Sequence, residues 1–325
     1  MTDRPSFELL SCPLHPESGS LRHDPSAGVL TCPKCVRPFP IVDGIPDLLV
    51  PDPEHAEFLA AEAEQWDGHA YRYEETRKYD CAYRAAVEAT AVALRPVAGN
   101  LILDAACGTG MTIRSYRQPG MRIVALDLSM VSLQWQRENL GYPEVLFVRG
   151  NLLALPFAAR TFSRVLCANA IHHLPASARE ESVRELGRVA QEGARVVVTV
   201  NNYSIPKRRA GWSKDGPAGS LSGAVQYIHR FGSLEFHNLL ATALDVERIR
   251  GAAMPLLYRF GMGTISERLE RVLRRFPAGV HWADMLIGVG SPRGVATAAM
   301  SASAARRPQP HQSTGEPSAR SRAGR

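Results

Sequence analysis

The sequence predicts an α/β fold, and three observations support this. The apolar segment 101–104 ends in Asp104 and is followed by a tight turn with Gly108 and Gly110, after which a helix is expected near residue 111. A second apolar segment, 122–127, ends in another acidic residue seventeen positions after Gly110. The composition, with 45% hydrophobic and 22% charged residues among 325, is typical of a soluble globular protein with one large domain and a small one.

The glycine-rich turn and the acidic residue after it point to a ligand site. Glycine allows positive φ and a close approach of the backbone to a ligand. Asp127, at the end of the second apolar segment, is placed to accept hydrogen bonds from a ribose. The glycines do not follow the order G-x-G-x-x-G, so the turn does not favour a dinucleotide.

Residues 104–110 resemble the D-x-x-x-G-x-G loop of class I methyltransferases, which bind S-adenosylmethionine. Further segments follow in the order of that family and resemble its strands three to seven: 145–157, 162–175, 181–202, 244–251 and 284–290. The resemblance covers roughly residues 66–290 and implies a seven-stranded, doubly wound, Rossmann-like sheet. Its HHLP segment resembles the small-molecule C- and O-methyltransferases.

The same resemblance implies a set of donor-binding residues. Asn151 occupies the position where the family usually has aspartate. The side-chain carbonyl of Asn151 can still accept a hydrogen bond from the adenine amino group. Asn169 either contacts the donor or shapes a turn. The set is Asp104, Ala105, Cys107, Gly108, Thr109, Gly110, Asp127, Leu128, Asn151, Leu152 and Asn169.

The candidate catalytic residues are His172 and His173, which follow the fourth predicted strand. The carboxyl ends of strands are where open α/β sheets bind ligands. One of the two histidines is expected to remove a proton from the acceptor, while the other caps the loop. An insertion at about 201–232 is expected to form the acceptor pocket.

Residues 1–50 predict a separate module that holds a metal. Cys12 and His15 form one C-x-x-H pair, and Cys32 and Cys35 form a C-x-x-C pair, with sixteen residues between the two pairs. Two such turns are close to the spacing of a zinc ribbon with a tetrahedral site. A segment this short buries little core, so bound zinc would explain how it folds.

The module resembles the small zinc-ribbon proteins that accompany certain methyltransferases in trans, here fused in cis. Those proteins usually have cysteine where this chain has His15. Because four protein ligands leave no open position, the zinc is expected to be structural. Residues 51–80 predict a helical linker or lid, 81–290 the methyltransferase domain, and 291–325 a basic tail.

The charge distribution argues against nucleic acid as a substrate. Six arginines and Glu316 give the segment 291–325 five of the six net positive charges, and the rest of the chain is nearly neutral. The tail is rich in Ser, Ala, Pro and Arg and is expected to be disordered. A globular RNA-binding enzyme usually presents a basic face, so we expect a small-molecule or glycan acceptor.

The favoured function is O-methylation of such an acceptor by S-adenosylmethionine. The alternatives are an rRNA or tRNA base methyltransferase, a C-methyltransferase of a quinone or polyketide-type acceptor, and a non-catalytic partner subunit. No apolar run approaches the roughly 18 residues of a membrane span. Polar residues interrupt the segment before Cys12, so we expect no signal peptide. We therefore expect a cytoplasmic protein. The sequence does not predict an oligomeric state.

Overall fold

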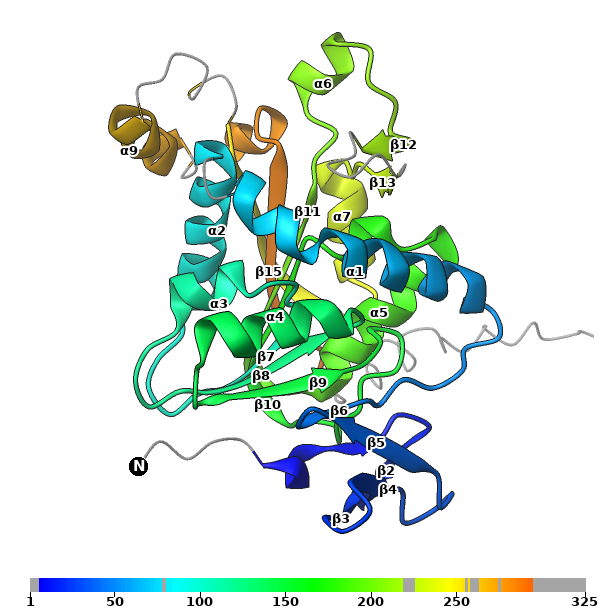
Figure 1. The fold of residues 1–325 in the computed structure, drawn as a ribbon. Helices are drawn as coiled ribbons and strands as arrows, with labels where there is room; N and C mark the ends of the chain where they lie inside the picture. The colour runs from blue at the N-terminus through cyan, green and yellow to red at the C-terminus, as the bar shows by residue number, and fades with distance from the viewer. Residues whose placement is uncertain are drawn as a thin grey trace, which may run out of the picture. The chain divides into compact units, whose positions relative to one another are not determined.

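The computed structural model of the protein describes residues 6–77, 80–218, 226–254, 257, 263–273 and 276–294. Within them, one sheet of seven strands forms the centre of the fold (Figure 1). The strands are, in chain order, β7 (Leu101–Ala105), β8 (Arg122–Asp127), β9 (Val145–Arg149), β10 (Phe162–Ala168), β11 (Ala190–Asn201), β14 (Leu244–Ala252) and β15 (Met285–Pro292).

The spatial order of the strands is β14-β15-β11-β10-β7-β8-β9. The five strands from β9 to β11 run parallel. Strand β15 lies between β11 and β14 and is antiparallel to both. The predicted seven-stranded Rossmann-like sheet is therefore confirmed, and the parallel strands end at one shared edge.

Helices cover both faces of the sheet because its strands are apolar on both sides. Ile102 and Ile123 face one hydrophobic cluster, together with residues of α2 (Cys81–Leu94), α3 (Met111–Tyr116) and α4 (Met130–Leu140). Leu103 and Val124 face the other cluster, together with residues of α5 (Ala176–Val189) and α7 (Ser233–Leu240). Helix α3 begins at residue 111, where the sequence predicts a helix.

Three helices and a hairpin surround this layered core. Helix α1 (Ala56–Arg77) lies across α4, and α9 (Gly263–Leu273) precedes the last strand (Figure 1). The segment after β11 contains the short helix α6 (Ile205–Arg209) and the antiparallel pair β12 (Asp215–Ala218) and β13 (Gln226–His229). Of the predicted acceptor insertion, residues 219–225 lie outside the described residues.

The N-terminal module is a small antiparallel β structure. It begins with a 3-10 turn, Phe7–Leu9. Outside the module, another 3-10 turn, Ile171–His173, follows β10 of the main sheet. Its strands are β1 (Ser11–Cys12), β2 (His15–Ser20), β3 (Arg22–Asp24), β4 (Val29–Thr31), β5 (Pro38–Val42) and β6 (Ile45–Pro46). They form a two-stranded pair, β1-β2, and a four-stranded sheet, β3-β4-β5-β6.

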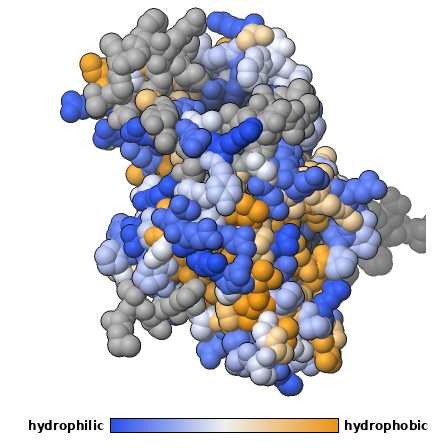
Figure 2. All heavy atoms as spheres, in the orientation of Figure 1, coloured by the Kyte–Doolittle hydropathy of each residue, from blue (hydrophilic) through white to orange (hydrophobic). Residues whose placement is uncertain are grey.

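The module packs on the β9 edge of the large sheet. The backbone N–H of Leu48 donates to the carbonyl of Arg149 at 2.9 Å, and the guanidinium of Arg149 pairs with Asp47 at 2.9 Å. Leu10 and Phe39 of the module belong to the same hydrophobic cluster as β8 and β9. In the space-filling view, hydrophobic residues are exposed over the lower half of this face, where module and sheet meet (Figure 2). The contacts cover a sheet edge that would otherwise present unpaired backbone groups.

The predicted basic tail falls outside the described residues from position 295 onward. Among the residues that are described, no helix has both the length and the apolar character needed to cross a membrane. The domain boundaries expected from the sequence stay predictions.

Candidate functional site

A cavity opens at the carboxyl ends of β7, β8 and β10, beneath helix α1. About 880 Å³ of space lies between its walls, and this value includes space that is open to solvent. Its walls come from the turn after β7, the ends of β8 and β10, the loop after β9, and α1. Of the residues that the sequence predicts, it is lined by Gly108, Thr109, Asp127, Leu128, Asn151, Leu152, Asn169 and His173.

The glycine-rich turn presents bare backbone to this cavity. Gly108 has φ 53°, and a side chain built there would find no atom within 4 Å. Gly110 has φ 79°, but a side chain there would collide with Gln136 of α4 at 2.5 Å. The first glycine therefore leaves room for a ligand, whereas the second allows the turn to pack against a helix.

Asp127 ties the end of β8 to the same turn. Its Oδ2 accepts a hydrogen bond from the backbone N–H of Gly108 at 2.7 Å, and its Oδ1 accepts one from Ser129 at 2.9 Å. Burial raises the pKa of this carboxyl, while the two backbone donors act in the opposite direction. Each carboxylate oxygen has two lone pairs, so Asp127 can still accept bonds from a ligand.

Asp104 lies behind the turn and keeps one unsatisfied oxygen. Its Oδ2 accepts a hydrogen bond from the Tyr116 hydroxyl at 3.2 Å, whereas Oδ1 has no partner among the described residues. Burial raises the pKa of Asp104 to about 7, against the effect of the Tyr116 bond. A buried acceptor without a donor costs free energy unless a ligand or water supplies one.

The loop after β9 and the end of β10 complete the wall. Asn151 Oδ1 accepts the backbone N–H of Leu153 at 3.1 Å, so one of its lone pairs fixes the loop. Asn169 takes the left-handed conformation, with φ 57°, and its Oδ1 accepts the Thr199 hydroxyl at 3.2 Å. Both side chains are thus held in place by their own backbone or neighbouring strand.

The remaining predicted donor residues do not line the cavity. Ala105 is buried in β7, and Asp104 lies beside it. The Cys107 sulfur accepts a hydrogen bond from the Gln136 amide at 3.0 Å, which attaches the turn to α4. With Gly110, these residues shape the turn from behind.

The two candidate histidines have different positions. The His173 ring lines the cavity, and its Nδ1 lies 3.2 Å from the carbonyl of Tyr227. The His172 ring is buried beside Asn201, whose side-chain nitrogen is 3.0 Å from Nε2, and it does not line the cavity. Burial lowers the pKa of His173 to about 4 and that of His172 well below its usual range.

Sequence reasoning missed Glu62, which lines the cavity from α1. Its side chain is 9% exposed and its Oε2 accepts the indole N–H of Trp66 at 3.0 Å. Burial raises the pKa of Glu62 to about 7. The Trp66 ring in turn meets the His173 ring edge-on, with 5.6 Å between centroids. Glu62 is one of several glutamates in an alanine-rich helix, and no local pattern distinguishes it from the others.

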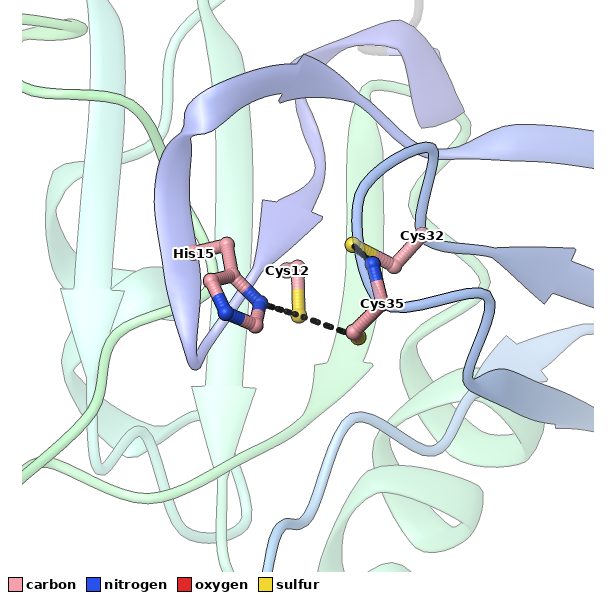
Figure 3. Close-up of side chains that lie close together, drawn as sticks. All are labelled: Cys12, His15, Cys32 and Cys35. Carbon is pink, nitrogen blue, oxygen red and sulfur yellow. Dashed lines mark hydrogen bonds between the residues drawn. The ribbon is translucent and has the colours of Figure 1, made fainter.

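The four predicted metal ligands meet in the N-terminal module. The ligand atoms of Cys12, His15, Cys32 and Cys35 all lie within 4.8 Å of one another, and the side chains point toward a common centre (Figure 3). Cys12 Sγ is 3.7 Å from His15 Nδ1 and 3.9 Å from Cys35 Sγ. Tetrahedral zinc, with Zn–S bonds of about 2.3 Å, sets its ligand atoms about 3.5–3.8 Å apart. The two separations from Cys12 are therefore close to those of tetrahedral zinc, and the donor set is that of a structural zinc site.

Two family models match the chain. Residues 102–193 match the methyltransferase domain, and residues 3–44 match the Trm112p-like protein. The predicted methyltransferase domain is confirmed, as is the relation of the N-terminal module to a methyltransferase-associated zinc ribbon. The chain therefore carries a methyltransferase domain with a Trm112p-like module fused in front of it.

Curated relatives match the central part of the chain. Malonyl-[acyl-carrier protein] O-methyltransferase of Erwinia pyrifoliae is 34% identical over 43% of this chain and 50% of that protein. Demethylmenaquinone methyltransferase of Thermobifida fusca is 34% identical over 34% of this chain and 48% of that protein. The chain thus spans about half the length of these relatives.

A solved structure shares the fold. It is a chain from a complex that contains the Haloferax volcanii Trm112 methyltransferase activator. The TM-score is 0.51, and the identity is 18% over 71% of this chain and 97% of that chain. At this identity the likeness extends to the fold alone.

Proposed function

We propose that this chain is an S-adenosylmethionine-dependent methyltransferase that methylates a small molecule or a glycan on oxygen. The observation that supports this most is the cavity at the carboxyl edge of the sheet. It combines a glycine turn open to a ligand, Asp127 after the next strand and Asn151 after the third. These lie in the segment that matches the methyltransferase domain.

The residues of the cavity suit the donor. The donor supplies a methyl group on a sulfonium, and the protein supplies alignment. We assign the ribose hydroxyls to the free lone pairs of Asp127, the adenine amino group to Asn151 Oδ1, and close backbone contact to Gly108. The unsatisfied Oδ1 of Asp104 supports the presence of a polar ligand or water near the turn. Alignment of this kind contributes roughly 7–11 kcal/mol of barrier lowering in favourable cases.

We assign proton removal from the acceptor to Glu62, assisted by His173. Both side chains line the cavity. Of the two histidines, His173 is favoured because its ring lines the cavity and that of His172 does not. Glu62 has a pKa of about 7, which matches what a general base needs at neutral pH. His173, with a pKa of about 4, is neutral at pH 7 and serves as a hydrogen-bond acceptor that orients the hydroxyl.

We propose that zinc is bound by Cys12, His15, Cys32 and Cys35 and has a structural role. All four coordination positions are then filled by protein, which leaves none for substrate. The module's contacts with the β9 edge support a role in stabilising the methyltransferase sheet.

A second candidate is C-methylation of a quinone-type acceptor. It is supported by the likeness to proteins named demethylmenaquinone methyltransferase, and the same base would serve a phenol ring. Nucleic acid is not favoured, because residues 1–290 carry almost no net charge.

The experiment is methyl transfer from labelled S-adenosylmethionine to separated pools of small metabolites, glycans and RNA. We expect label in the small-molecule or glycan pool, and a lower kcat with nearly unchanged donor affinity in His173→Ala and Glu62→Gln. The control His172→Ala should have a smaller effect on kcat. Label in RNA alone would contradict the proposal.

A further inference from the structure

Arg179 of α5 is a buried cation that forms no direct ion pair among the described residues, although its charge helps to lower the pKa of Asp215. Only 7% of its surface is exposed. Its Nε donates to the carbonyl of Leu174 at 3.0 Å, and its guanidinium carbon lies 5.4 Å from the centroid of the Phe231 ring. Its Nη2 is buried and donates to no described residue. A buried donor of this kind costs free energy until a ligand or a water molecule accepts its hydrogen bond.

Two further cations lie in the same part of the molecule. Lys207 is mostly buried and donates to the carbonyl of Asn202 at 3.1 Å. Arg230 is 5% exposed and lies over the ring of Trp212 at 4.9 Å. Besides its burial, the charges of Lys207, Arg179 and Arg230 contribute to the low pKa of His172. The three cations therefore all act on His172, in the segment that follows β10.

The carboxylates of this region are bonded to other side chains. None of the described ion pairs includes Arg179. Asp215 bonds Tyr227 at 2.5 Å and His229 at 2.6 Å, Glu235 bonds His229 and Lys214 at 2.8 Å each, and Asp284 pairs with Lys207 at 3.0 Å.

A second polar group near this region also lacks a partner. The hydroxyl of Ser204, a residue 1% exposed at the start of α6, makes no hydrogen bond among the described residues. Tyr203, just before it, donates its backbone N–H to the carbonyl of Phe231 at 2.9 Å. Ser204 is thus a second buried polar group without a partner, next in sequence to a residue that bonds the backbone of Phe231.

These groups lie directly behind the wall of the cavity. Leu174, whose carbonyl accepts the Arg179 bond, lines the cavity, and so does His173. His173 is held against β13 by its contact with the Tyr227 carbonyl. The Arg179 side chain is therefore joined by a direct hydrogen bond to a residue of the cavity wall.

We propose that this region binds an anionic group of the methyl acceptor, a carboxylate or a phosphate, with Arg179 Nη2 as the central donor. The acceptor is then an acidic small molecule whose reactive oxygen lies in the cavity and whose anionic group lies behind His173. This inference rests on the proposed function for the identity of the ligand, but the anion site can be tested alone. A guanidinium suits both groups, since it binds carboxylate and phosphate oxygens with similar geometry.

The test is calorimetric titration of the full chain with malonate and with inorganic phosphate, at constant ionic strength. We expect saturable binding of at least one anion, weakened at least tenfold in Arg179→Met. Arg179→Lys keeps the positive charge and should weaken binding less, and it serves as the test variant if Arg179→Met does not fold. The matched control is Arg184→Met on the same helix, because Arg184 is half exposed and pairs with Glu180 and Glu181. Tighter binding of malonate would assign a carboxylate, and tighter binding of phosphate a phosphoryl group.

Two results would overturn the inference. One is a folded wild-type protein with no saturable binding of either anion, which would mean that water alone satisfies Arg179. The other is equal weakening in the Arg179 and Arg184 variants. Donor affinity, measured in the same samples, separates this outcome from failure of the proposed function: a protein that binds S-adenosylmethionine but neither anion contradicts only the acceptor site.

Discussion

The carboxylate of Asp127 accepts a 2.7 Å hydrogen bond from the backbone N–H of Gly108, nineteen residues earlier in the chain. This bond joins the end of β8 to the turn that follows β7. It gives Asp127 a structural role in addition to the ribose contact expected from the sequence. A variant at this position therefore tests both the turn and the ligand.

Replacing Asp127 separates these roles. Asp127→Ala should weaken S-adenosylmethionine binding by roughly 1.5–3 kcal/mol, the cost of a charge-assisted hydrogen bond, and should lower stability because two backbone donors lose their acceptor. Asp127→Asn keeps an acceptor oxygen and should be less destabilising. Calorimetry and thermal unfolding provide the measurements, with the exposed Glu138→Gln on α4 as control. Unchanged donor affinity in Asp127→Ala would show that this residue does not hold the ribose.

Ala106 offers a test of the turn that is independent of any ligand. It has φ 63°, in the left-handed region, where an L-residue pays about 1–2 kcal/mol. Ala106→Gly should remove this strain and raise the free energy of unfolding by roughly 0.5–1 kcal/mol, after the entropy cost of glycine. The neighbouring Ala105→Gly, in the buried strand β7, should instead destabilise. Chemical denaturation measures both, and equal losses in the two variants would argue against the strain.

Glu62 should make stability depend on pH. Its pKa is 4.5 as a free group and about 7 in the folded protein, so between these values the folded state holds a proton that the unfolded state has released. Stability should therefore fall as pH rises from 4.5 to 7. Asp104, with its pKa raised to about 7, changes the free energy of unfolding with pH in the same direction. Its contribution is the same in every variant compared, because each of them keeps Asp104.

Glu62→Gln should flatten this part of the stability curve, while the exposed Glu64→Gln on the same helix should leave it unchanged. Denaturation at a series of pH values gives the slopes. If both variants keep the wild-type slope, the carboxyl of Glu62 is not held protonated in the folded state.

The metal cluster predicts about one zinc per chain in freshly purified protein. Cys32→Ser should release the metal and lower the unfolding temperature, because the module shares a hydrophobic cluster with the sheet. Cys81→Ser, which removes a cysteine outside the cluster, should keep the metal. Metal analysis beside thermal unfolding tests this, and a folded, metal-free wild type would refute the zinc assignment.

The parts of the site that could be predicted from the sequence are those built by local rules. A strand, a glycine turn and an acidic residue at the end of the next strand define the cavity floor, since parallel strands end at one edge of the sheet. The ligand pairs Cys12–His15 and Cys32–Cys35 were predictable because each lies on a single tight turn.

The residues that were missed depend on how distant elements pack. Glu62 reaches the cavity only because α1 lies across α4, where Asp67 accepts the Ser129 hydroxyl at 2.5 Å. Arg179 is buried against the ring of Phe231, which comes from a segment 52 residues later in the chain. The β12–β13 hairpin comes from a segment rich in glycine and serine without a strand-like alternation. The His172–His173 pair was predicted, but which ring faces the cavity is decided by the 3-10 turn of residues 171–173.

The central claim, that the cavity is a donor site, is tested most directly by calorimetric titration of the full chain with S-adenosylmethionine. We predict saturable binding at a single site with micromolar affinity, lost or strongly weakened in Asp127→Ala and unchanged in Glu138→Gln. A folded, zinc-loaded protein that shows no binding of the donor would contradict the account.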